Sequence, residues 1–177
     1  IAKIVKGLRT FSRSADNDPF ELVQLQELIN ETFAFCAERF KNHEVILEVG
    51  VLPDILVECR ATQISQVLLN LLNNSFDAVA VHSEKRVRVE ARVMAGERLF
   101  LSVTDSGPGI PSSIADKLMQ PFFTTKEVGK GTGLGLSVGR GIAETHGGNL
   151  TLDRMSEQTR FVLDLPLRQG SMSKKVA

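Results

Sequence analysis

The sequence lacks tryptophan and tyrosine, and its 177 residues contain two cysteines and no excess charge of either sign. Lys and Arg total 21, as do Asp and Glu, so nothing in the net charge favours bulk binding to nucleic acid or to an anionic membrane. Cys36 and Cys59 fit no CxxC or CxxH spacing, which disfavours a disulfide framework and a structural zinc site. We expect reduced, half-buried thiols. No apolar run approaches the roughly 18 residues of a membrane span.

The residues that are present are typical of one globular domain. Hydrophobic residues make up 42% and charged residues 24% of the chain. At about 150 residues per domain, the length predicts a single domain with a sizeable core. The chain begins with Ile1 rather than Met, and the segment that follows does not resemble a signal peptide. We therefore expect a fragment of a cytoplasmic protein, or of the cytoplasmic part of a membrane-anchored one.

Hydrophobic periodicity predicts an α+β fold. Helices are expected where apolar residues recur every three or four positions, and strands where they alternate. The predicted helices cover 25–40, 61–81, 112–119 and 134–146, and the predicted strands cover 20–23, 45–51, 55–57, 87–94, 99–104, 150–152 and 159–165. Because helices and antiparallel strands are interleaved, we expect a mixed sheet covered on one face by helices.

The two ends of the chain are predicted to lie outside this domain. Ile1, Ile4, Leu8 and Phe11 occupy a and d positions of a short heptad pattern, which indicates the last turns of a helix that packs against partner helices. Polar, turn-forming residues follow and predict a hinge. We divide the chain into a helical end (1–14), a hinge (15–19), the domain (20–168) and a disordered tail (169–177).

The long helix predicted over 61–81 carries a stripe of amide and carboxylate side chains. At about 100° per residue the stripe spans roughly a 100° arc, opposite an apolar arc. Amide oxygens are suitable ligands for a hard cation, and amide N–H groups can bind phosphate oxygens. A helix that merely tolerates Asn on its solvent side is the alternative. The stripe consists of Gln63, Gln66, Asn70, Asn73, Asn74 and Asp77.

The segment DSGPGI (105–110) directly follows a predicted strand. Asp105 falls on the same face as the apolar residues of that strand, and a buried carboxylate needs a partner. Gly107 and Gly109 lack side chains, so a flat ligand could approach, and Asp105 could accept a hydrogen bond from the amino group of a base. The alternative is a plain Asp-Ser-Gly turn.

The segment GKGTGLGLS (129–137) leads directly into a predicted helix. Free backbone N–H groups and the positive end of a helix form an anion site, with Lys126 and Lys130 close by in sequence. The segment is not a P-loop, because that motif needs Gly at Thr124. It is not GxGxxG either, because Leu136 takes the place of the third glycine.

These segments, with PFFTTK (121–126) between the last two, resemble the ATP-binding catalytic domain of bacterial two-component sensor histidine kinases. NLLNNSFDA resembles the N box of that family, DSGPG the G1 box, PFFTTK the F box and GTGLGLS the G2 box. The resemblance covers about residues 20–167. It implies the Bergerat fold of the GHKL superfamily, a two-layer α/β sandwich with a mixed, mostly antiparallel sheet. It also implies a mobile ATP lid over about 110–132. GLRTFSR resembles the end of the preceding dimerisation domain.

The resemblance also implies roles for individual residues. Asn74 would bind Mg²⁺, Asn70 would face the phosphates, Asp105 would bind adenine, and Phe122 and Phe123 would anchor the lid. Asp77 is either a nucleotide contact or structural. The catalytic set is Asn70, Asn74 and Lys126. The ATP-binding set is Asn70, Asn74, Asp77, Asp105, Gly107, Gly109, Ile110, Phe123, Thr124, Lys130, Gly131, Thr132, Gly133, Leu134, Gly135 and Leu136.

A phosphoacceptor histidine is missing from the sequence. His43 precedes a strand pattern, His82 follows the long helix, and His146 precedes a double glycine, so none fits the family's helical H box. We expect the acceptor on an upstream helical domain that forms a homodimer, with relay of the phosphoryl group to a response regulator. No contact with nucleic acid or membrane is expected.

Two alternatives to the kinase remain. One is a GHKL ATPase, whose relatives typically carry Glu at the position of Asn70. The other is a nucleotide-binding module without catalytic activity.

Overall fold

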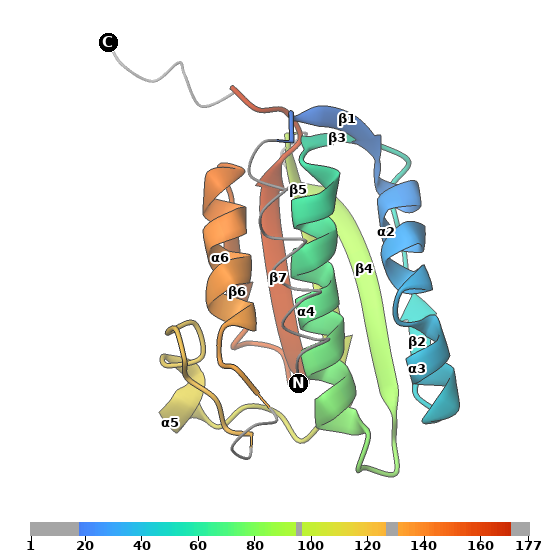
Figure 1. The fold of residues 1–177 in the computed structure, drawn as a ribbon, viewed down its shortest axis with the longest axis vertical. Coiled ribbons are helices and arrows are strands. Elements are labelled where there is room, and N and C mark those ends of the chain that lie inside the picture. The colour runs from blue at the N-terminus through green and yellow to red at the C-terminus, as the bar shows by residue number, and fades with distance from the viewer. Residues whose placement is uncertain (1–17, 95–96, 127–130, 171–177) are drawn as a thin grey trace.

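The computed structural model describes residues 18–94, 97–126 and 131–170, which form interleaved helices and strands (Figure 1). In chain order the elements are β1 (Glu21–Gln24), α2 (Leu25–Ala34), α3 (Ala37–Asn42), β2 (Ile46–Val49), β3 (Leu56–Cys59), α4 (Ala61–Val79), β4 (Arg86–Met94), β5 (Arg98–Asp105), α5 (Ser112–Ala115), α6 (Gly135–Thr145), β6 (Asn149–Leu152) and β7 (Thr159–Pro166). The predicted helical end of the chain, residues 1–14, lies outside the described residues, as does most of the predicted tail.

Two sheets organise the described chain. The larger has the strand order β2-β4-β5-β7-β6, in which β2 and β4 are parallel and the other neighbours are antiparallel. A smaller antiparallel pair joins β1 to β3. The register of the larger sheet places Asp105, the last residue of β5, opposite Val87 on β4 and Thr159 on β7.

The helices cover one face of the larger sheet, as predicted (Figure 1). Helix α4 lies in the middle, between α2 and α6. Its apolar arc is buried together with the inward-facing residues of β4, β5 and β7, which alternate with solvent-facing residues along each strand. Burying this apolar surface is the main favourable contribution to folding. The predicted two-layer α/β fold is therefore confirmed.

The prediction of one continuous helix over 25–40 is wrong. The helix ends at Ala34, and α3 begins three residues later. At the break the backbone N–H groups of Phe35 and Cys36 bond three residues back, which tightens the chain. The Thr32 hydroxyl also donates to the Leu28 carbonyl at 2.7 Å, and such back-bonding bends helices.

The two cysteines are buried rather than half-buried, so this part of the expectation is also wrong. Both are free thiols. Burial raises the pKa of Cys36 above its ordinary value, and it raises the pKa of Cys59 to about 12. Among the described residues, no helix is both long and apolar enough to cross a membrane.

Candidate functional site

The predicted site residues converge at one end of the larger sheet. The C-terminal half of α4, the loop after β5 and the N-terminus of α6 meet there, next to the segment that contains α5 (Figure 1). This convergence follows from the topology, because β5 runs toward this end and α4 packs along β5.

Asp105 lies at the base of the site and is 2% exposed. Its Oδ1 accepts a hydrogen bond from the Gly107 backbone N–H at 3.0 Å, and the hydroxyls of Ser75 and Thr159 also bond to the carboxyl group. Burial raises the pKa of Asp105, although these hydrogen bonds oppose the shift. Gly107 is required here, because a Cβ at this position would lie 2.7 Å from Asp105 Oδ1. The expectation that a buried Asp105 needs partners is confirmed.

Asn70 connects α4 to the start of α6. Its Nδ2 donates to the Gly135 carbonyl at 3.2 Å. No described side chain caps the N-terminus of α6, so the first N–H groups of this helix are available to an anion. Immediately before the helix, the Thr132 hydroxyl accepts from the Leu134 N–H at 3.4 Å. Gly135 and Leu136, which we predicted to contact phosphate, thus lie in the first turn of α6.

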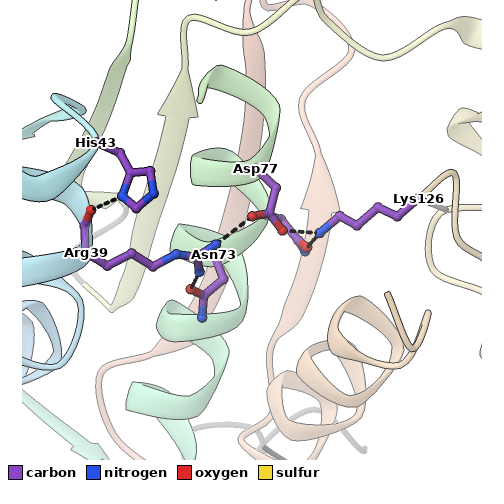
Figure 2. Close-up of polar contacts among 6 residues, drawn as sticks. Arg39, His43, Asn73, Asp77 and Lys126 are labelled. Atoms are coloured by element: carbon purple, nitrogen blue, oxygen red, sulfur yellow. Dashed lines mark hydrogen bonds and ion pairs between the residues drawn. The ribbon is translucent and has the colours of Figure 1, made fainter. Parts of the chain in front are cut away.

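Further along α4, five charged or amide side chains form a network (Figure 2). Lys126 Nζ lies 3.3 Å from Asn74 Oδ1 and 2.6 Å from Asp77 Oδ2. The other carboxylate oxygen, Asp77 Oδ1, accepts from Arg39 at 2.8 Å. Asp77 therefore bridges a lysine of the predicted lid and an arginine of α3, and the amide oxygen of Asn74 faces a positive charge.

The polar stripe on α4 does not form one phosphate-facing surface. Gln63 and Gln66 are 5% and 9% exposed, so the first half of the stripe is buried. Asn73 points toward α3, where its Oδ1 accepts from Arg39 at 2.7 Å (Figure 2). Asn70 and Asn74 instead contact Gly135 and Lys126. Asn73 and Gln66 therefore do not share a surface with Asn70 and Asn74, because neighbouring helices cover both flanks of α4.

The backbone joins the two sides of the predicted lid at Phe122 and Gly133. The Phe122 N–H donates to the Gly133 carbonyl at 2.9 Å. Both residues have positive φ, 66° and 65°. A Cβ at Gly133 would lie 2.4 Å from the carbonyl carbon of Phe122, so only glycine fits there. The Phe122 side chain is 75% exposed, so this residue holds its position through the backbone rather than by burying its ring.

The structure describes all but one of the remaining predicted residues. Ile110 and Leu136 pack against the core, and the Thr124 hydroxyl accepts from the Lys126 N–H at 3.1 Å. Gly109 has a positive φ of 80° in the turn after β5, with open space around it. Phe123 is half-buried, and Gly131 approaches the side chains of Thr124 and Lys126. Lys130 lies outside the described residues.

Sequence reasoning missed three residues of the site. Ser75 and Thr159 bond to Asp105, and Arg39 bonds to Asp77. The strand register would have indicated Thr159, because it lies directly opposite Asp105. Ser75 interrupts the Asn-rich segment of α4, but no pattern links Arg39 to α4, since Arg39 and Asp77 are separated by 38 positions.

The three histidines lie outside any H-box helix. His43 follows the last residue of α3, and its Nδ1 lies 2.9 Å from the Arg39 carbonyl oxygen. His82 lies in the turn after α4. His146 is fully buried; its Nε2 accepts from the Arg60 N–H at 3.1 Å, and burial lowers its pKa. These positions agree with the expectation that His146 is structural.

Comparisons with known proteins identify the fold and this arrangement of motifs. Residues 59–169 match the family described as histidine kinase-, DNA gyrase B- and HSP90-like ATPases. The two-component sensor PprA of Pseudomonas aeruginosa is 34% identical over 175 residues, covering 94% of this chain and 18% of PprA. The solved catalytic domain of histidine kinase ThkA is 31% identical with a TM-score of 0.73, covering 84% of this chain and 97% of that chain.

A further solved structure is that of ThkA in complex with the response regulator protein TrrA. It is 27% identical to this chain with a TM-score of 0.73, and the match covers 94% of this chain and 49% of that chain.

The fold and the site thus define an ATP-binding domain of the GHKL type. The chain belongs to the histidine kinase-, DNA gyrase B- and HSP90-like ATPase family, and within it to the catalytic domains of histidine kinases. It spans between 18% and 33% of the length of the curated relatives it matches.

Proposed function

We propose that this domain binds Mg-ATP and transfers the γ-phosphoryl group to a histidine on a separate helical domain. The observation that carries the proposal is the convergence of Asp105, Asn74 and the uncapped N-terminus of α6 at one end of the sheet. These three features would bind the base, the metal and the phosphates respectively.

Asp105 would recognise the adenine. Its carboxyl group is fixed by the Gly107 N–H and by the hydroxyls of Ser75 and Thr159, so its orientation does not depend on the ligand. A preorganised acceptor loses little freedom on binding. An ionised acceptor also forms a stronger hydrogen bond with an exocyclic amino group than a neutral one does.

Asn74 would hold the magnesium ion. Mg²⁺ prefers oxygen ligands and is usually bound by one or two protein groups together with substrate phosphates. Asn74 Oδ1 fits this requirement, since it is an amide oxygen that already contacts the Lys126 ammonium. The bound ion would neutralise phosphate charge, and Lys126 would add a second positive charge once it moves from Asn74 to a phosphate oxygen.

Phosphoryl transfer would then depend on positioning rather than on a general base. Asn70 carries no basic group, and Asp77, the one carboxylate on α4, lies seven residues further along the helix, about 10 Å along its axis. Along α4, which the structure describes from end to end, no carboxylate is therefore placed beside Asn70 to deprotonate water, which favours a kinase over an ATPase. We propose that the acceptor histidine lies on a helical domain upstream that dimerises, and that the phosphoryl group passes to a response regulator. The ThkA–TrrA complex supports the regulator as partner.

We also place this domain in the cytoplasm, where ATP is available and free thiols persist. Two measurements test the proposed function. Calorimetric titration should show ATP binding that strengthens with Mg²⁺, and a steady-state assay should show phosphate release well below about 1 s⁻¹. Absence of ATP binding would refute the proposal. Release near or above about 1 s⁻¹ that Asn74→Ala abolishes would favour an ATPase.

A further inference from the structure

Arg39 belongs to none of the four motifs and lies before the residues that match the family, yet it reaches the site from α3 (Figure 2). One guanidinium nitrogen donates to Asn73 Oδ1 at 2.7 Å, and another donates to Asp77 Oδ1 at 2.8 Å. The guanidinium carbon lies 3.9 Å from the centroid of the Phe76 ring. Three groups of α4 therefore hold this one side chain.

These contacts fix Arg39 more firmly than a single ion pair would. An exposed pair of flexible side chains gains little, because both side chains lose freedom when they meet. The planar fork of arginine is preorganised for two hydrogen bonds, and its face can stack on an aromatic ring. Asp77 is consequently held through Oδ1, which leaves Oδ2 directed at Lys126 Nζ, 2.6 Å away.

The cluster contains one carboxylate between two cations, Arg39 and Lys126. When a triphosphate enters the site, Lys126 can leave Asp77 only if that carboxylate keeps another counter-ion. Arg39 supplies it, and it does so from the flank of α4 opposite the lid segment. Without Arg39, the departure of Lys126 would leave an unpaired carboxylate beside the incoming phosphates, and like charges at this distance repel.

We propose that Arg39 is a positioning residue for nucleotide binding: as the permanent counter-ion of Asp77, it frees Lys126 to exchange from Asp77 to a phosphate oxygen. Arg39 acts through Asp77 and does not itself touch the nucleotide. The inference rests on the proposed function, because it assumes that ATP phosphates bind beside Asn74 and Lys126.

The test is a double-mutant cycle on the 177-residue chain, read out as ATP affinity by calorimetry in the presence of Mg²⁺. Arg39→Met keeps the length of the side chain but removes the charge and the fork. We expect it to weaken ATP binding about two- to fivefold, the range for an exposed ion pair. In an Asp77→Asn background no carboxylate needs a counter-ion, so Arg39→Met should leave the ATP affinity of that background unchanged.

Arg140→Met is the matched control. Arg140 is similarly exposed and pairs with Glu144 on α6 at 2.9 Å, away from the network. This variant measures the effect of removing one surface arginine charge, and we expect it to bind ATP like the parent. Thermal unfolding of each variant, measured in parallel, separates a loss of stability from a loss of affinity.

Two results would overturn the inference while leaving the proposed function intact. Arg39→Met could lower the unfolding temperature with no change in ATP affinity, which would make Arg39 a structural contact between α3 and α4. It could also weaken ATP binding by the same factor in the parent and in the Asp77→Asn background, which would show that Arg39 does not act through Asp77. If the parent chain itself does not bind ATP, both proposals fail.

Discussion

Replacing Asp105 by Asn is expected to separate the stability of this domain from its function. Asp105 is buried, and burial raises its pKa in the folded state. A group with a raised folded-state pKa stabilises the fold at low pH and loses that contribution as the pH rises through the folded pKa. Above that folded-state pKa the ionised, buried carboxylate therefore costs stability. Asp105→Asn removes this cost and should leave the free energy of unfolding unchanged or raise it.

The same substitution should weaken ATP binding. The amide has one acceptor oxygen, and that oxygen is needed by the Gly107 N–H, which bonds Asp105 Oδ1 at 3.0 Å. The amide nitrogen then replaces the second carboxylate oxygen and presents an N–H donor to the adenine amino group, which is itself a donor. Losing a hydrogen bond to a charged acceptor costs about 1.5–3 kcal/mol, which corresponds to roughly a 10- to 150-fold weaker affinity. Inorganic triphosphate, which lacks the base, should bind as it does to the parent.

Asp105→Ala is the matched comparison. It removes the same acceptor but also leaves the Gly107 N–H, Ser75 and Thr159 without their buried partner, at a cost of about 1–3 kcal/mol of unfolding free energy. The assays are urea unfolding and calorimetric titration with ATP and with triphosphate. ATP binding like that of the parent in both variants would exclude Asp105 as the adenine acceptor. Equal loss of unfolding free energy in Asp105→Asn and Asp105→Ala would show that the buried charge of Asp105 does not cost stability.

The remaining predictions concern two glycines, one buried histidine and the proposed metal ligand. Gly133→Ala should lower the free energy of unfolding by about 1–3 kcal/mol, because φ is positive and the new Cβ would meet Phe122. Gly141→Ala, on α6 with open space around it, should raise it by about 0.5–1 kcal/mol in the same denaturation assay. His146 has a lowered folded-state pKa, so stability should be full above pH 6.5 and fall as the pH drops below it. The free energy of unfolding, measured by urea denaturation between about pH 5 and 7.5, should depend less steeply on pH in His146→Gln than in the parent. Asn74→Ala should reduce the gain in ATP affinity that Mg²⁺ provides, measured by titration with and without Mg²⁺. Equal gains in the variant and the parent would exclude Asn74 as the Mg²⁺ ligand.

Much of the fold could be predicted because local periodicity and tertiary packing agree. The alternation in β4 and β5 gives a hairpin whose register brings Asp105 to the sheet end, and the apolar arc of α4 is the arc that is buried. The break between α2 and α3 could not be predicted, since Cys36 and Phe40 continue the helical spacing across it and both are buried. There the turn at Phe35 overrides a pattern that would also suit an unbroken helix.

The candidate site was predictable where short segments carry it, and not where distant segments meet. Asp105 and Gly107 are two positions apart, and Gly133 lies beside the start of α6, so their arrangement follows from local chain geometry. The flanks of α4 depend on which helices pack against it. For this reason the sequence grouped Asn73 with Asn70 and Asn74 in one polar stripe, whereas packing of α3 directs Asn73 to Arg39.

Transfer of the phosphoryl group to histidine distinguishes a histidine kinase from an ATPase and from a nucleotide-binding module without catalytic activity. The 177-residue chain should be incubated with ATP labelled on the γ-phosphate, alone and with the separate helical domain that we propose carries the acceptor histidine. We predict no label on the chain alone, and acid-labile label on the helical domain when both are present. Acid-stable label on this chain, or label on its own His43, His82 or His146, would exclude transfer to a histidine on a separate domain.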